Sequence, residues 1–243
     1  MKILNIQVLR GPNFWSVNHK LIQFTLDIGR YEQLPTDELP GFEARIRALL
    51  PGMYNHHCSE GKPGGFFERI RRGTWLAHVS EHIALELQTL AGMPCNFGKT
   101  RGTDTPGVYD VAFTYHEERA GIYAAEAAVR VAEALAEAIP YDIENDIVNL
   151  RKIAEQDGPG PSTSAILKSA EKRNIPYIRV GEGSFYQLGY GCEQRMIEAT
   201  IAGTTSAIAV DIADDKNRTK ILLEAASLPV PAGITIRDED ELS

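Results

Sequence analysis

The stretch TWLAHVSEHIALELQTLAG, residues 74–92, carries the strongest secondary-structure signal in the chain. Thr74 stands where a helix N-cap belongs, and Gly92 stands where a C′ glycine belongs. Between them, apolar residues recur every three or four positions, which is the period of one buried helix face: Trp75, Val79, Ile83, Leu87 and Leu90. We therefore predict a helix of about five turns, packed on a core.

Strands and further helices flank this segment. Short runs rich in branched residues predict strands at 3–9, 21–28 and 108–115. Amphipathic or Ala-rich runs predict helices at 42–50, 117–139 and 143–156. Gly- and Pro-rich residues predict loops at 51–65 and 93–107. The expected fold is α+β, with helices packed on a small, mostly antiparallel sheet.

The cluster Gly158-Pro159-Gly160-Pro161 predicts a domain boundary. We expect one domain over 1–160 and a small α/β lobe over 161–243. The second part shows helical patterns at 162–173 and 215–227, strand patterns at 177–180, 185–188, 195–200 and 234–236, and an apolar run at 207–212. Residues 238–243 have the acidic first turn of a helix, which favours a truncated polypeptide over a frayed acidic tail.

Composition limits the functional class. Among 243 residues, 43% are apolar, and 33 acidic against 25 basic side chains give a net charge of −8. These proportions exclude wholesale disorder, and the charge argues against nucleic acid as the main partner. No apolar run reaches the about 18 residues of a membrane span, and the polar N-terminus does not resemble a signal peptide. Three scattered cysteines suit a reducing compartment, so we expect a cytoplasmic protein.

A possible metal site lies inside the predicted helix. His78 and His82 are four residues apart, so both imidazoles project from one face and can hold one zinc ion. Glu81 lies on the same surface and could act as general base toward a water at the metal. The order is H-x-x-E-H, the inverse of the zincin motif. The alternative is an exposed helix face that carries two ordinary histidines.

The third ligand is open. Glu86, Glu117 and Glu118 are candidates, and Glu86 could instead be a partner that holds a ligand in place. We select Glu118 because the start of the long Ala-rich helix favours a carboxylate. The run His56-His57-Cys58 resembles a metal cluster but lies in a predicted loop without a matching partner motif. Cys95 and Cys192 are interpreted as inert thiols.

Basic residues stand out in this acidic chain: Lys62, Arg69, Arg71, Arg72, Lys99 and Arg101. They could bind an anionic chain or carboxylates through their guanidinium groups. The commoner explanation for such a set is a solvated face.

Several motifs, in order, resemble the cyanophycin synthetases. These are LRGPNFWS at 9–16, the run from Gly73 to Gln88, TPGVY at 105–109 and FYQLGYG at 185–191. The resemblance implies a polymerase of aspartate and arginine that uses ATP and magnesium. Residues 1–160 resemble its N-terminal domain, and 161–243 resemble the first part of its ATP-grasp domain. The remaining ligase regions of the family would lie beyond Ser243, so we do not expect this chain to ligate by itself.

The resemblance also implies roles for particular residues. Lys216 and Lys220 match the segment whose lysine contacts nucleotide phosphates. The N-terminal domain of the family holds cyanophycin or its primers, and Arg10, Lys99 and Arg101 become candidate substrate contacts. In some members this domain resembles a zinc metallopeptidase, a pattern that the H-x-x-E-H motif carries. The family often has a second cysteine where this chain has Lys62, so a paired-cysteine role is not supported.

The family further suggests a homo-oligomer. The alternatives to a hydrolase are a non-catalytic polymer-anchoring module and an inactive fragment.

Overall fold

The structure, a computed structural model, describes residues 1–234 and 236. It divides into two compact units, and the division falls after Pro159, within the Pro/Gly cluster. Each unit is described by itself. The strand expected at 234–236 lies partly outside the described residues, and the helical turn expected at 238–243 lies wholly outside them.

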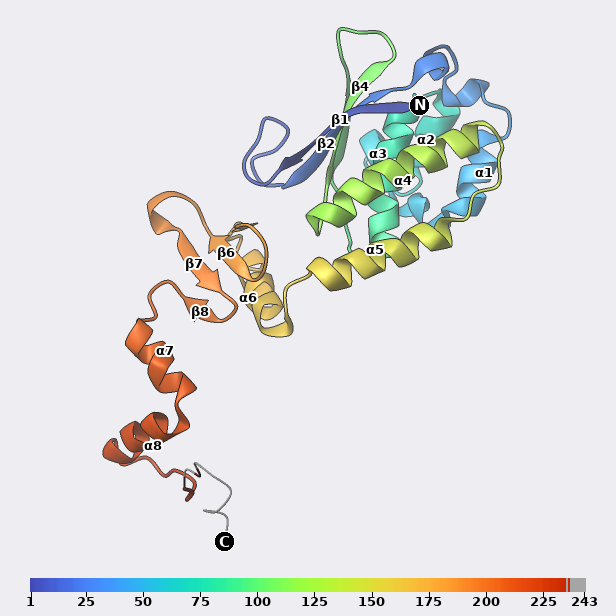
Figure 1. The fold of residues 1–243 in the computed structure, drawn as a ribbon. Coiled ribbons are helices and arrows are strands. Elements are labelled where there is room, and N and C mark those ends of the chain that lie inside the picture. The colour runs from blue at the N-terminus through green and yellow to red at the C-terminus, as the bar shows by residue number, and fades with distance from the viewer. Residues whose placement is uncertain (235, 237–243) are drawn as a thin grey trace. The chain divides into compact units, whose positions relative to one another are not determined.

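The first unit is built on a four-stranded antiparallel sheet (Figure 1). Its strands are β1 (Lys2–Leu9), β2 (Leu21–Asp27), β3 (Gly98–Gly102) and β4 (Val108–Thr114), in the spatial order β1-β2-β4-β3. Three strands were predicted from the sequence. β3 falls inside the predicted loop 93–107, because its residues GKTRG have no apolar member and its strand character comes from pairing with β4.

Five helices complete the unit: α1 (Phe42–Leu49), α2 (Gly65–Arg72), α3 (Leu76–Leu90), α4 (Glu118–Ala136) and α5 (Ile143–Asp157). The predicted helix over 74–92 is confirmed as α3, and Gly92 has a φ of +90°, as a C′ glycine should. Its N-cap is Trp75 rather than Thr74. The predicted loop at 51–65 contains two 3₁₀ turns, η3 (Pro51–Asn55) and η4 (Cys58–Glu60).

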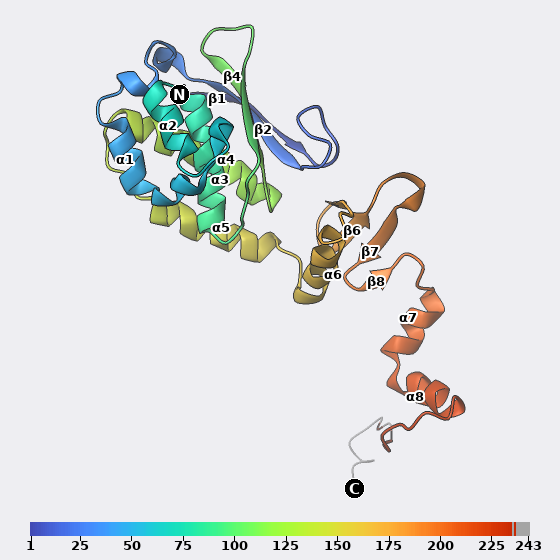
Figure 2. The ribbon, with the colours of Figure 1, turned by 180° about the vertical axis from the view of Figure 1, so that it is seen from behind.

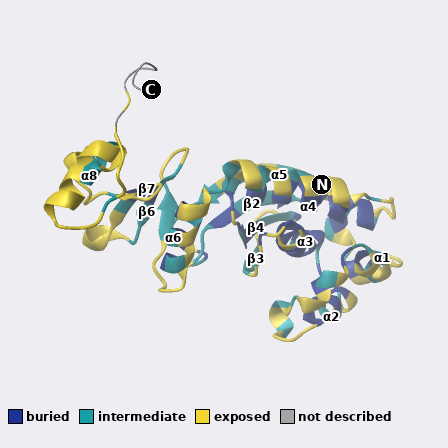
Figure 3. Cartoon of the chain, turned by 90° about the horizontal axis from the view of Figure 1, so that it is seen from below, coloured by how far each residue is buried: buried dark blue, intermediate teal, exposed yellow. Residues whose placement is uncertain are grey.

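The core lies between the sheet and the paired helices α3 and α4, which run side by side across one sheet face (Figures 1 and 2). β2 and β4 contribute buried residues such as Phe24 and Phe113, and α3 contributes Val79 and Ile83. The facing surface of α4 is largely alanine, which lets the two helices approach closely. As a result α3 is buried on nearly all sides, including its polar residues (Figure 3).

The second unit has helix α6 (Pro161–Glu171) and an antiparallel sheet of four short strands: β5 (Tyr177–Arg179), β6 (Phe185–Leu188), β7 (Arg195–Glu198) and β8 (Ile201–Ala202). Leu167, Tyr186 and Ile197 form its small core. Two helices follow, α7 (Ala207–Asp214) and α8 (Lys216–Ala225). Both helices are largely exposed, as Ile208 at 72% exposure illustrates.

The mixture of helices with two small antiparallel sheets agrees with the α+β prediction. Among the described residues, every helix is too short or too polar to cross a membrane.

Candidate metal centre

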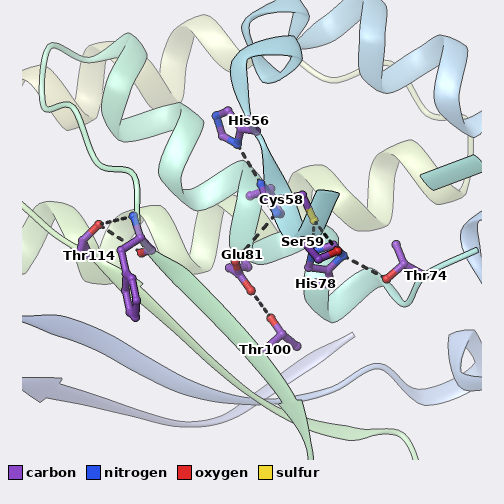
Figure 4. Close-up of polar contacts among 10 residues, drawn as sticks. His56, Cys58, Ser59, Thr74, His78, Glu81, Thr100 and Thr114 are labelled. Carbon is purple, nitrogen blue, oxygen red and sulfur yellow. Dashed lines mark hydrogen bonds and ion pairs between the residues drawn. The ribbon is translucent and has the colours of Figure 1, made fainter. Parts of the chain in front are cut away.

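Three side chains from two elements meet at α3. His78 comes from the helix and Cys58 from the turn η4 (Figure 4). His82 lies one turn after His78 on the same helix. Cys58 Sγ lies 3.3 Å from His78 Nε2, and one ligand atom from each residue lies within 4.8 Å of the others. A thiolate with two imidazoles is a donor set that suits zinc. A tetrahedral zinc site has a sulfur-to-nitrogen edge of about 3.6 Å, which is close to the separation of Cys58 Sγ and His78 Nε2.

Close backbone packing brings Cys58 to the helix. A Cβ on Gly65 would overlap the carbonyl oxygen of His57, so only glycine lets α2 begin this near to the turn. The Phe66 amide donates to the carbonyl of His56 at 3.2 Å, which ties the same two segments together. Cys58 itself has a φ of +51°, a left-handed conformation that is uncommon for a side-chain-bearing residue. The turn therefore presents its thiol at the cost of local strain.

Both histidines have further partners on the side of the ring away from this group. Thr74 Oγ1 lies 3.0 Å from His78 Nδ1, and His56 Nδ1 lies 2.9 Å from His82 Nδ1. Such outer contacts orient metal-binding imidazoles in known sites.

The electrostatics keep both imidazoles neutral. Burial lowers the pKa of His78 to about 4, with a smaller contribution from Arg69. Burial lowers the pKa of His82 well below its ordinary value, helped by His78 and His56. The neutral ring is the form that binds a metal ion.

Glu81 lies beside this group, with its Oε1 3.9 Å from His82 Nε2. Its Oε2 accepts a 2.6 Å hydrogen bond from Thr100 Oγ1 on β3 (Figure 4). A Cβ on Gly98 would lie 2.7 Å from Glu81 Cδ, so β3 can approach only because that residue is glycine. Burial raises the pKa of Glu81 to about 7, against the hydrogen bond from Thr100, which lowers it. The carboxyl is therefore poised for proton transfer near neutral pH.

Burial argues against one interpretation of the H-x-x-E-H motif, the exposed helix face with two ordinary histidines. Glu81 is 4% exposed and His82 is 6% exposed, so the motif is not an ordinary solvated helix face.

The structure does not bring the expected third ligand, Glu118, to this group. Glu118 forms a two-pronged ion pair with Arg10, at 2.6 and 2.8 Å, and is not among the clustered side chains. Its helix-terminal position does favour a carboxylate, but Arg10 at the end of β1 supplies the partner. The third member of the group at α3 is Cys58. The signal in the sequence is the run His56-His57-Cys58, and its partner residues lie on α3 rather than in a neighbouring motif.

The three residues predicted to contact substrate do not form one group. Lys99 and Arg101 lie on the opposite face of β3 from Thr100, because side chains alternate along a strand. There Lys99 Nζ is 5.3 Å from the centre of the Phe97 ring, and the Arg101 guanidinium is 4.8 Å from that of Trp15. Arg10 is engaged by Glu118.

Three other basic residues of the set have acidic partners, as expected of a solvated face. Lys62 pairs with Glu68, and Arg72 pairs with Glu60. Arg71 lies 3.5 Å from Glu43.

The two predicted nucleotide-binding lysines lie on α8. Lys216 begins the helix after the Asp215 N-cap, and Lys220 follows one turn later. Both line one surface hollow of the second unit, together with acidic residues such as Asp211 and Asp214.

Known proteins resemble the whole chain. Residues 23–137 match the cyanophycin synthase-like N-terminal domain. The chain is 43% identical over 246 aligned positions to the cyanophycin synthetase of Crocosphaera subtropica, 44% to that of a Nostoc species and 42% to that of a Synechocystis species. All of this chain is covered, but it spans only 27–28% of the length of those relatives. The chain is therefore homologous to the N-terminal region of the cyanophycin synthetases and contains their N-terminal domain.

Proposed function

We propose that the first unit contains a zinc-dependent hydrolytic site that cleaves cyanophycin or its primers. The observation that carries this proposal is the buried Glu81 carboxylate 3.9 Å from His82, beside a group that Cys58 and His78 complete. Homology supports the choice of polymer, because the relatives are named as cyanophycin synthetases.

The roles follow from the geometry. Cys58, His78 and His82 would hold the ion, which supplies Lewis-acid activation of the reacting groups when bound. Glu81 takes a proton from the attacking water and returns it to the leaving amine. Thr100 holds one Glu81 oxygen at 2.6 Å and leaves the other toward His82. General base catalysis by such a group contributes about 10²–10⁴-fold in rate.

The test is Glu81→Gln in the whole chain, with cyanophycin as substrate and new amino termini as the measured product. Cleavage should fall by about 10²–10⁴-fold, while zinc content by elemental analysis stays unchanged. Glu68→Gln is the control, because Glu68 is an exposed carboxylate paired with Lys62. Undiminished cleavage by the Glu81→Gln protein would remove Glu81 from the mechanism.

A second function, holding the polymer without cleaving it, is favoured by the outer face of the sheet. Lys99 and Arg101 are exposed there, and each lies over an aromatic ring. Such cation–π contacts hold a cationic group in place while leaving it able to bind a carboxylate. Binding of short aspartyl-arginine oligomers that persists after chelation of zinc, and that weakens in Lys99→Ala/Arg101→Ala, would support this function.

For the second unit we propose that Lys216 and Lys220 contact ATP phosphates in an ATP-grasp-like lobe, with magnesium as the counter-ion. Their position along one hollow supports a shared ligand. Weaker binding of ATP after Lys216→Ala, compared with the exposed Lys172→Ala, would be the expected result. Equal binding by the two variants would contradict the proposal.

A further inference from the structure

A chain of hydrogen bonds runs from Glu86 through His56 to His82. Glu86 Oε2 lies 2.9 Å from His56 Nε2, and His56 Nδ1 lies 2.9 Å from His82 Nδ1. Glu86 is 4% exposed, although it lies two helical turns from His78 and takes no part in the clustered group. A buried carboxylate in this position needs an explanation.

The donor and acceptor roles along the chain follow from chemistry. A carboxylate can only accept, so His56 donates to it from Nε2. A neutral His56 then has its lone pair on Nδ1, and His82 must donate to that atom from its own Nδ1. We infer that Glu86 and His56 are positioning residues that fix His82 in the Nδ1–H tautomer, which leaves the Nε2 lone pair free to bind a metal ion.

Packing holds the chain in place. A Cβ on Gly52 would overlap Glu86 Oε1, so the carboxylate rests directly against the backbone of η3. The Phe66 ring lies against both histidines, with centroid separations of 6.4 Å to His56 and 4.4 Å to His82. Neither ring is free to turn over without disturbing this packing.

The neighbouring ligand has a parallel arrangement. Thr74 Oγ1 meets His78 Nδ1 at 3.0 Å, and His78 Nε2 faces Cys58. Each histidine is thus held at Nδ1, and the Nε2 of His82 lies 3.9 Å from Glu81 Oε1. This inference rests on the proposed zinc site. It adds that His56 and Glu86 raise the affinity of that site for zinc.

The first test measures the tautomers directly. Long-range ¹H–¹⁵N NMR spectra of the histidine rings, recorded on the zinc-free whole chain, should show His82 protonated at Nδ1 and His56 protonated at Nε2. A spectrum with His82 protonated at Nε2, or with His56 protonated at both nitrogens, would overturn the inference. This test needs neither a variant nor a bound metal.

The second test measures zinc affinity by competition with a chromophoric chelator. His56→Leu removes the acceptor and should lower zinc affinity about 10–100-fold. Glu86→Gln replaces the obligate acceptor with an amide and should lower zinc affinity by a smaller factor. Asp146→Asn is the matched control, because Asp146 is a buried carboxylate of the same unit whose partners are Tyr123, Tyr141 and Arg130. Its zinc affinity should stay within about twofold of the unaltered chain.

Cobalt substitution separates a positioning role from direct ligation. The cobalt spectrum of His56→Leu should keep the band shape of the unaltered protein, because the ligands are the same. A changed spectrum would make His56 a ligand, and an unchanged zinc affinity would leave His56 without a role; either result overturns the inference. If the unaltered chain binds no zinc, the proposed function fails, while the NMR test of the tautomers still stands.

Discussion

The two faces of the first unit's sheet use the same strands for opposite purposes. The inner face is continuous with the main core and reaches Glu81 through Thr100. The outer face has only a small apolar cluster, of Trp15, Leu21 and Ala112, and carries exposed basic groups. β3 contributes to both faces with only five residues, because successive side chains of a strand point to opposite faces. Substitutions on the inner face should change stability and chemistry, whereas those on the outer face should change binding.

The largest effect is expected from Phe24→Ala, in the middle of the inner face. Phe24 is fully buried and packs edge-on against Phe113, so its loss should lower the free energy of unfolding by about 3–5 kcal/mol. Denaturant unfolding measures this. Phe14→Ala is the comparison: Phe14 is 71% exposed, and its loss should cost less than about 1 kcal/mol. Phe14 lies in the segment between β1 and β2, so equal losses would mean that burial against the inner face does not set the stability of this unit.

Gly98→Ala should come next, because the new methyl group would push against Glu81. We expect a loss of about 1–3 kcal/mol in unfolding free energy, together with loss of polymer cleavage as the carboxylate moves. Gly102→Ala, on the same strand, is a matched control. Its nearest neighbour would be a Tyr109 ring carbon at 3.9 Å, so both unfolding and cleavage should be nearly unchanged. Normal cleavage by the Gly98→Ala protein would show that Glu81 tolerates displacement.

Thr100→Val keeps the shape of the side chain and removes the hydroxyl that donates to Glu81. A buried carboxylate oxygen without its donor costs about 1–3 kcal/mol, which thermal or denaturant unfolding would detect. Thr100→Ser restores the hydroxyl and should recover most of the stability and the cleavage rate. If serine and valine behave alike, the hydrogen bond at 2.6 Å is not what holds Glu81.

The smallest structural effect is expected from Arg101→Ala on the outer face. Arg101 is exposed, so its cation–π contact with Trp15 should contribute only about 0.5–1 kcal/mol to stability. The oligomer affinity should nevertheless fall several-fold, and more so at low salt, where charge contacts are strongest. Arg119→Ala removes the same charge from α4, where Arg119 pairs with Asp157, and should leave oligomer binding unchanged. If the two variants bind the oligomers equally well, Arg101 is not part of the surface that binds the polymer.

Periodicity predicted those parts of the fold whose residues face one core. The helix α3 and the strands β1, β2 and β4 have apolar residues at regular spacing, and their bounds differ from the predictions by one or two residues. β3 and α2 were missed for different reasons. β3 has no apolar residue, and α2 follows directly on a Gly-rich stretch that suggested only loop.

The candidate site was half predictable. His78, Glu81 and His82 share one helix, so their proximity follows from helix geometry alone. Cys58 lies twenty positions earlier and meets His78 only because Gly65 allows the turn to pack closely. The choice of Glu118 rested on a real helix-terminus preference, but the sequence could not reveal that Arg10 would reach it. Tertiary contacts between separate elements decide such cases.

The placement of His78, Glu81, His82 and Glu86 on the single helix α3 has a consequence for how the chain tolerates changes of length. Successive residues of a helix are rotated by about 100°, so one residue inserted between His78 and His82 would turn His82, Glu86 and all that follows away from their partners. One residue inserted in the hairpin tip between Thr103 and Gly107, which is exposed and joins β3 to β4, would shift nothing in the site. In a library of single-residue insertions, those between His78 and His82 should abolish the site, and those between Thr103 and Gly107 should be tolerated, even though the two segments are close in sequence.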